Sequence, residues 1–274
     1  MRIGLTLPSF RDDPEIPLAV AVAAEQSGLD AVFAFDHLFR IGLDGQRRPA
    51  LECTVLLGAV AVATSRIGLA SLVARATLRP PATLAAAFDT LHRISSGRVI
   101  AAIGAGDAQS RVENESFGLD FGTEPERLEQ LAASVRATAG RGYPVWVGGR
   151  AAKVGSVSAE HADGWNRWGG SADRLGSDAG AVRELVAQRG RDPARFTVSW
   201  GGLVVVGGSD AEAESKRDRL QPGPDVLVGG PEVVADAFRA YGDAGADWVI
   251  AGPVDSSDPE NAAVLGELVA PLLR

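Results

Sequence analysis

The feature that most constrains the fold is a repeated alternation of short β-branched runs and helical segments along almost the whole chain. Most intervals between candidate strands match one strand–helix–strand unit, which needs roughly 30 residues or more. Eight parallel strands with their helices can close into an α/β barrel, and 274 residues are enough for one such barrel. The candidate strands begin near Arg2, Ala31, Ile67, Val99, Val145, Gly164, Thr197 and Trp248.

The alternative is an open, doubly wound sheet. A dinucleotide-binding sheet of that kind normally carries Gly-x-Gly-x-x-Gly after its first strand. Here residues 5–10 read Leu-Thr-Leu-Pro-Ser-Phe, without a glycine. No linker or shift in composition divides the chain. We therefore predict a single-domain TIM (β/α)8 barrel over residues 1–274, with a polar, glycine-rich loop at 105–122 and an inserted helix at Asp210–Leu220.

Charge and composition exclude several classes of function. The 27 basic and 35 acidic residues give a net charge of −8, which disfavours nucleic-acid binding. The single cysteine, Cys53, excludes an internal disulfide and a cysteine-rich metal site, and we expect it to pack as a small apolar residue. Neither zinc-binding spacing nor a histidine cluster is present, so we expect no metal.

The N-terminal residues show no signal-peptide pattern. The longest apolar stretch, residues 55–63, is far shorter than the roughly 20 residues of a membrane span. We expect a cytoplasmic protein with a small-molecule substrate and no membrane partner.

Because barrel active sites lie at the carboxyl ends of the strands, His37 is the first candidate catalytic residue. It follows Asp36 at the end of the second strand, and an imidazole can transfer protons near neutral pH. The alternative is a histidine bonded into a loop. His92 and His161 lie near expected helix ends, where a structural role is the simpler interpretation.

Two further strand ends carry glycines. Gly104 and Gly106 precede Asp107, and glycines let the backbone approach a flat ligand closely. Asp107 could hold or donate a proton there, or could be a plain turn residue. After the fifth strand, residues 148–150 (Gly-Gly-Arg) open a helix whose free N–H groups could bind the phosphate of a cofactor. The alternative is a flexible turn.

Three tryptophans, Trp146, Trp165 and Trp168, follow or end expected strands. They could form the wall of a pocket for an aromatic ring, or they could belong to the core.

Taken in order, six segments of the chain resemble the luciferase-like monooxygenase superfamily, whose members are flavin- or deazaflavin-dependent TIM barrels. The resemblance spans nearly the whole chain. The segments are residues 28–37, 66–82, 95–107, 144–149, 162–165 and 228–232.

The resemblance implies roles for the candidate residues. In the branch that uses coenzyme F420, the Asp-His pair corresponding to Asp36 and His37 contacts the deazaflavin ring. A non-proline cis peptide near Leu72–Val73, after Ser71, would lie behind the ring. Asp107 would position or protonate the ring, although some members carry Glu there. Gly148, Gly149 and Arg150 would receive the cofactor phosphate.

These observations predict an F420-dependent oxidoreductase that moves a hydride between F420 and a small organic substrate. One alternative is an FMN-dependent monooxygenase that uses reduced flavin and oxygen, and another is a non-catalytic flavin-binding barrel whose pocket Trp165 or Trp168 fills. The lysines that bind sugar phosphate in one F420 branch have no obvious counterparts here. Because barrels of this kind often pair, we also expect a possible homodimer.

Overall fold

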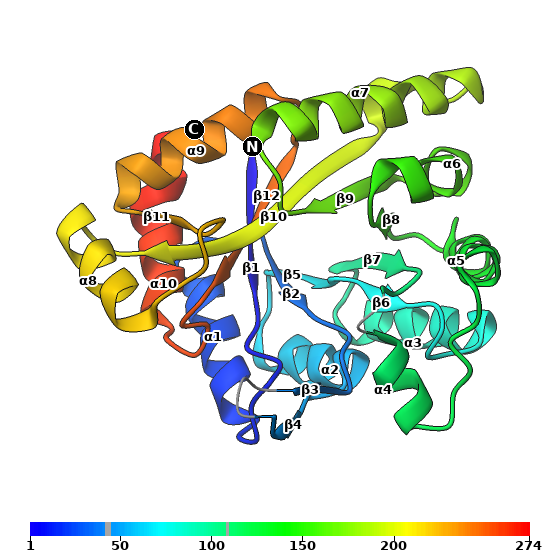
Figure 1. Cartoon of the computed structure of the whole chain (residues 1–274), viewed down its shortest axis with the longest axis horizontal. Coiled ribbons are helices and arrows are strands. Elements are labelled where there is room, and N and C mark those ends of the chain that lie inside the picture. The colour runs from blue at the N-terminus through cyan, green and yellow to red at the C-terminus, as the bar shows by residue number, and fades with distance from the viewer. Residues whose placement is uncertain (42–44, 108–109) are drawn as a thin grey trace.

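The computed structural model describes residues 1–41, 45–107 and 110–274 and shows a closed barrel of parallel strands (Figure 1). Each strand pairs with the next around the ring, and β12 pairs with both β10 and β1, which closes it. The predicted TIM barrel is therefore confirmed, and the open sheet is excluded. The barrel strands are β1 (Arg2–Thr6), β2 (Ala31–Ala34), β5 (Gly68–Ser71), β7 (Val99–Gly104), β8 (Val145–Gly148), β9 (Gly164–Trp168), β10 (Thr197–Val206) and β12 (Trp248–Pro253).

Helices cover the outside of the barrel (Figure 1). The last covering helix, α10, begins as a single α-helical turn and continues into a π-helical segment at Val264–Val269. The covering helices are α1 (Glu15–Gln26), α2 (Cys53–Ala63), α3 (Pro81–Ile94), α5 (Glu124–Thr138), α6 (Ala151–His161), α7 (Ala172–Gln188), α9 (Pro231–Asp243) and α10 (Glu260–Ala263).

Side-chain alternation along the strands divides the core into two parts. Successive strand residues point to opposite faces of the sheet. The outward set packs against the helices in one large cluster, which includes Trp165 and Trp200. The inward set fills the barrel with a smaller aromatic cluster in which Phe33, Trp146 and Trp248 lie within 6.3 Å of one another, centroid to centroid.

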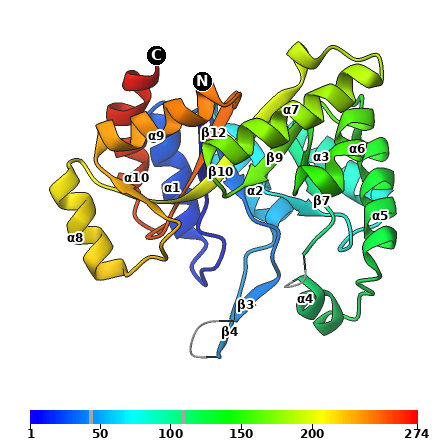
Figure 2. The same ribbon diagram turned by 45° about the horizontal axis from the view of Figure 1, so that its top comes forward.

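Four additional pieces of structure decorate the barrel, and Figure 2 shows the hairpin and α4 at the end opposite the two termini. A hairpin, β3 (Phe39–Ile41) and β4 (Arg47–Pro49), follows β2. A short strand, β6 (Ala74–Arg75), pairs with β7 after β5. The helix α8 (Asp210–Leu220) confirms the predicted insertion, and β11 (Leu227–Gly229) follows it along β10.

The fourth piece is α4 (Ser110–Ser116), which lies within the segment predicted to be a polar loop. The loop prediction was therefore wrong for these residues. The local reason is a cap, since the amide of Ser110 donates to the Asp107 carboxylate at 3.0 Å.

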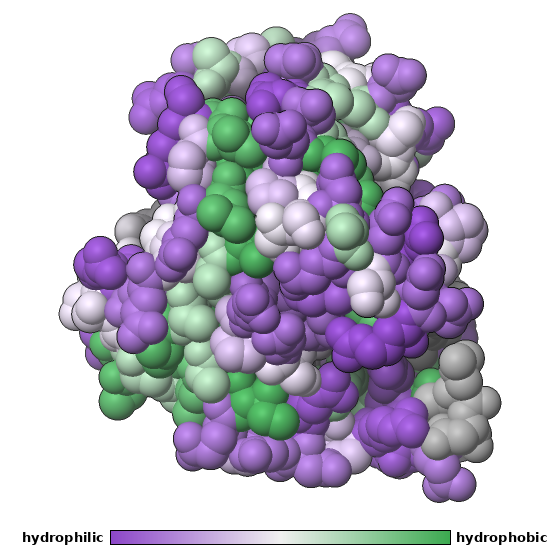
Figure 3. Space-filling model, turned by 90° about the vertical axis from the view of Figure 1, so that its left-hand side faces the viewer, coloured by the Kyte–Doolittle hydropathy of each residue, from purple (hydrophilic) through white to green (hydrophobic). Residues whose placement is uncertain are grey.

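The surface is mixed on the side formed by α8, α9 and α10. Figure 3 views this side and shows hydrophobic residues in separate green areas among hydrophilic ones. No helix in the described residues is long and apolar enough to cross a membrane. The thiol of Cys53 is fully buried and lies 3.5 Å from the Ala34 carbonyl, as expected for a packing residue. Burial raises the pKa of this thiol.

Candidate functional site

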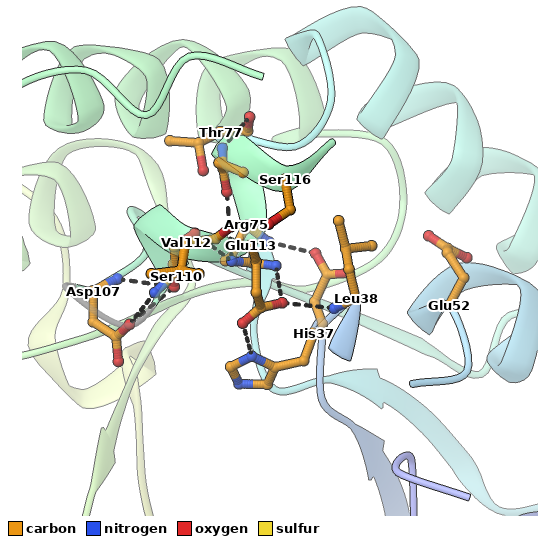
Figure 4. Close-up of polar contacts among 12 residues, drawn as sticks. His37, Leu38, Glu52, Arg75, Thr77, Asp107, Ser110, Val112, Glu113 and Ser116 are labelled. Carbon is orange, nitrogen blue, oxygen red and sulfur yellow. Dashed lines mark hydrogen bonds and ion pairs between the residues drawn. The ribbon is translucent and has the colours of Figure 1, made fainter. Parts of the chain in front are cut away.

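At the carboxyl end of the barrel, His37 forms an ion-pair contact with Glu113 (Figure 4). Nδ1 of the imidazole lies 2.7 Å from Oε1 of Glu113. His37 comes from the segment after β2, whereas Glu113 comes from α4, the helix after β7. The imidazole is about one-third exposed, with 31% of its side chain accessible. Within the described part of the chain, its Nε2 makes no hydrogen bond.

The second oxygen of Glu113 also has partners. Oε2 accepts from the backbone amide of Leu38 at 2.6 Å and from Nη2 of Arg75 at 2.8 Å. Burial raises the pKa of the Glu113 carboxyl, but the contact with His37, the Leu38 amide and the charge of Arg75 outweigh burial. The net pKa lies below its usual value, so Glu113 is a carboxylate at neutral pH.

Asp36, the residue directly before His37, lies in a second ionic cluster. Its carboxylate accepts from Nη1 and Nη2 of Arg79 at 2.7 and 2.9 Å, and from the amide of Arg75 at 2.7 Å. Arg79 also contacts Glu52, the residue before α2. Burial lowers the pKa of Arg79, but the two carboxylates raise it more strongly. The Asp36 side chain is fully buried. Its contacts with Arg75 and Arg79 hold the backbone immediately before His37 in place.

The sequence-predicted Asp107 is exposed at the end of β7. Its carboxylate accepts from both the amide and the hydroxyl of Ser110, at 3.0 and 2.9 Å. Asp107 thus bonds the first residue of α4 as a capping carboxylate does. The structure brings Glu113, six residues further along the chain, to His37. The proton role of Asp107 stays a prediction.

The segment that follows β5 packs against two glycines, one at the end of β7 and one at the end of β8. Ser71 is buried and bonds both the amide and the carbonyl of Ala102 on β7. The peptide between Leu72 and Val73 is cis, at the position expected from the resemblance. A Cβ at Gly104 or at Gly148 would lie 2.5 or 2.6 Å from the side chain of Val73. Glycine at both positions therefore makes room for Val73 at the rim.

At the end of β8, Gly149 and Arg150 come directly before a helix. Gly149 has a φ of +142°, where other residues are strained, and the helix α6 begins directly after Arg150. Arg150 is exposed and makes no side-chain cap contact with the helix. The N–H groups of the first turn of α6 and the guanidinium thus occur together at the end of β8. Gly106 has a φ of +74° next to α4.

Two aromatic rings lie beside His37, one from the segment after β1 and one from the segment after β2. The ring centroids of Phe10 and Phe35 lie 5.6 and 6.5 Å from that of His37. Trp168 contacts Phe35 edge-on at 5.6 Å and is 41% exposed. A Cβ at Gly201 would lie 2.6 Å from the indole of Trp168, so the indole lies directly on the β10 backbone.

The other two tryptophans are buried. Trp146 belongs to the core inside the barrel. Trp165 packs outward, with its Nε1 donating to the Gly149 carbonyl at 2.8 Å. The interpretation of these two as pocket walls is wrong, because alternation along β8 and β9 directs them elsewhere. His92 lies beside the ring of Tyr143 and His161 beside Glu160, both away from the rim elements.

Sequence reasoning missed Glu113, Arg75, Phe10 and Phe35. The signal for Glu113 was the cap of α4, an aspartate followed by a serine three positions later. The signal for the two phenylalanines was their place at the ends of β1 and β2. Arg75 gave no signal, because nothing local requires an arginine inside a short edge strand.

No group of histidine, cysteine or carboxylate side chains among the described residues could hold a metal ion. The closed barrel carries a histidine, an ionic cluster and glycines at its carboxyl rim, which is the edge at which (β/α)8-barrel enzymes hold their active sites. A model of the luciferase-like monooxygenase family matches residues 1–224, and the chain belongs to that family.

Relatives of known function share part of the chain. An F420-dependent glucose-6-phosphate dehydrogenase of Nakamurella multipartita is 33% identical over 151 residues, which are 55% of this chain and 42% of that protein. The enzyme of the same name from Microbacterium testaceum is 29% identical over 211 residues, 72% of this chain and 59% of that protein. The chain thus spans about half the length of these curated relatives.

Solved structures share the whole fold. An F420-dependent secondary alcohol dehydrogenase, solved with an F420–acetone adduct, has a TM-score of 0.83 at 18% identity and covers 100% of this chain and 99% of its own. A riboflavin lyase, solved with modified FMN and riboflavin, has a TM-score of 0.81 at 14% identity and covers 100% of this chain and 91% of its own. Proteins that share this fold have therefore been solved with an F420 adduct and with modified FMN.

Proposed function

We propose that the protein is an F420-dependent oxidoreductase that transfers a hydride between the deazaflavin and a small organic alcohol or carbonyl compound. The observation that carries the proposal is the state of His37 at the rim, where Nδ1 is held by Glu113 and Nε2 has no hydrogen-bond partner among the residues that the structure describes. The similarity to F420-dependent dehydrogenases in sequence supports F420 over FMN.

The residues present fit a flat, phosphorylated cofactor. Val73 lies against Gly104 and Gly148, where a larger residue would displace it. We assign this surface to the ring, and Gly149, Arg150 and the start of α6 to the phosphate. When bound, F420 supplies a carbon that accepts or donates a hydride.

A side chain of the protein would accept and return the proton. As an alcohol is oxidised, Nε2 of His37 accepts the hydroxyl proton, and Glu113 stabilises the imidazolium through Nδ1. In the reverse direction the imidazolium returns that proton to the carbonyl oxygen. A substrate that touches His37 also meets Phe10 and Phe35, so its reacting carbon carries apolar groups.

The test is cofactor binding followed by turnover. Oxidised F420 and FMN are added separately to the purified protein, and quenching of cofactor fluorescence gives each affinity. F420 with secondary alcohols should lose its visible absorbance. Preferential binding of FMN, with oxygen consumed after flavin reduction, would establish the monooxygenase alternative instead.

His37→Ala tests the proton step. Turnover should fall by about 10² or more, while F420 affinity changes little, because the proton acceptor is lost and the phosphate site is intact. Unchanged turnover in this variant would remove His37 from the reaction.

A further inference from the structure

We propose that Glu113 is the positioning residue of the site and that it fixes the proton of neutral His37 on Nδ1, which leaves Nε2 as the proton acceptor. The proposal rests on the proposed function only for its catalytic consequence. The tautomer itself is a property of the protein without cofactor.

The first step is the bonding of the carboxylate. Oε1 of Glu113 faces Nδ1 of His37 at 2.7 Å, and Oε2 receives two N–H donors, one from Leu38 and one from Arg75 (Figure 4). An ionised carboxylate can only accept hydrogen bonds. Nδ1 must therefore carry the hydrogen, and the lone pair of neutral His37 lies on Nε2.

The second step is that Glu113 cannot turn away. Glu113 is 4% exposed, and side-chain hydrogen bonds hold its helix, α4, against residues 75–77. The side chain of the next residue, Asn114, donates to the Thr77 carbonyl at 3.1 Å. Arg75, itself 4% exposed, reaches both the Ser110 carbonyl and Asn114 at 3.4 and 3.5 Å. The carboxylate is thus held against His37 by the packing of α4.

The asymmetry between the two oxygens allows a sharp test with Glu113→Gln. The amide of glutamine has one acceptor and one donor end. Two donors, from Leu38 and Arg75, meet at the Oε2 position, so the amide oxygen should occupy it. The NH₂ group then faces Nδ1, which must accept. The substitution should therefore move the imidazole proton from Nδ1 to Nε2.

The readout is the pair of imidazole ¹⁵N chemical shifts, measured without cofactor at alkaline pH, where imidazoles are neutral. The chain has three histidines, and loss of one signal in His37→Ala assigns that of His37. The wild-type protein should show the Nδ1–H tautomer of His37, and Glu113→Gln should show the Nε2–H tautomer. A wild-type His37 with its proton on Nε2 would overturn the proposal, whether or not the variant folds.

The matched control is Glu115→Gln on the same helix. Glu115 is exposed and contacts Arg111 one turn earlier. This variant should keep both the wild-type tautomer and wild-type turnover. A tautomer change in Glu115→Gln equal to that in Glu113→Gln would show a general effect of α4 and contradict the assignment.

Turnover separates this inference from the proposed function. If His37 is the proton acceptor, Glu113→Gln should lower kcat by about 10² with little change in KM, because substrate contacts remain and only the acceptor is lost. If the tautomer inverts while turnover is unchanged, Glu113 positions His37 but His37 is not the acid–base group. If the tautomer does not invert, the role of Glu113 fails while that of His37 stands.

Discussion

At the residue scale, the carboxylates near His37 differ in how they are held. Glu113 and Asp36 are buried and paired with arginines, whereas Asp107 is exposed and bonded to Ser110. Removing one charge of a buried pair is costly, because its partner is left uncompensated. The loss of an exposed cap costs less.

Asp36→Asn should therefore destabilise the protein strongly. Two guanidinium contacts of Arg79 would face a neutral amide, with a loss of roughly 3 kcal/mol in the free energy of unfolding. Denaturant unfolding of the variant and the wild type measures the difference. A change below about 1 kcal/mol would show that the Arg79–Glu52 contact alone holds the segment.

Asp107 can be tested by separating its cap from a proton role. Asn is as good an N-cap as Asp, so Asp107→Asn should keep its stability, whereas Asp107→Ala should lose about 1 kcal/mol. Thermal unfolding checks both. Turnover of the Asn variant then reports on the carboxyl group alone, and a fall there would support the protonation role that the family resemblance implies.

At the scale of elements, the ends of β5, β7 and β8 depend on one another through Val73. Gly148→Ala would place a methyl group about where the Val73 side chain lies. We expect a loss of roughly 1–3 kcal/mol in stability and weaker F420 binding, measured by fluorescence titration. Adding Val73→Ala should restore much of the stability by removing the collision. If the double variant is no more stable than the single one, the clash with Val73 is not the cause.

A second element-scale contact joins α1 to the start of β5. The carboxylate of Glu25 accepts from the amides of Ser65, Arg66 and Ile67 at 2.6–3.1 Å. Burial alone would raise the pKa of Glu25, but the hydrogen bonds from these amides outweigh burial and lower the pKa from 4.5 to about 2. Because the folded pKa lies below the unfolded one, the contribution to stability is present above pH 4.5 and is lost as the pH falls toward 2.

Glu25→Gln should thus be less stable than the wild type at neutral pH, by roughly 1 kcal/mol for a partly exposed site. The gap should close as the pH falls between 4.5 and about 2, which unfolding at several pH values would show. A gap that is constant over this range would mean that the charge of Glu25 does not matter.

At the scale of the whole molecule, α2 is apolar on its outer side as well as its inner side. Val55 and Val62 are 71% and 79% exposed, and no charged residue lies within Cys53–Ala63. A helix that is apolar all round is usually buried. We propose that a second copy of the chain covers α2 in a homodimer.

Light scattering after size exclusion should give twice the chain mass, and Val62→Glu should give a monomer. Leu268→Glu, at another exposed apolar residue, is the control and should remain dimeric. A monomeric wild type at micromolar concentration would contradict the proposal.

The sequence by itself determined the barrel and the placement of its rim. Seven of the eight predicted strand starts coincide with the observed ones, and that of Ile67 differs by one residue. This succeeded because hydrophobic periodicity and glycine stops are local signals. For the same reason His37 could be found as the residue after a buried strand.

Only the tertiary structure decided which groups meet His37. Glu113 is 76 residues away along the chain, and Arg75 is 38 residues from Glu113. A contact between residues so far apart in the sequence depends on barrel closure and on the position of α4 at the rim. No local pattern of charge or hydropathy encodes either of these. The same holds for Trp146 and Trp165, because the pleat of each strand in the closed barrel sends one inward and the other outward.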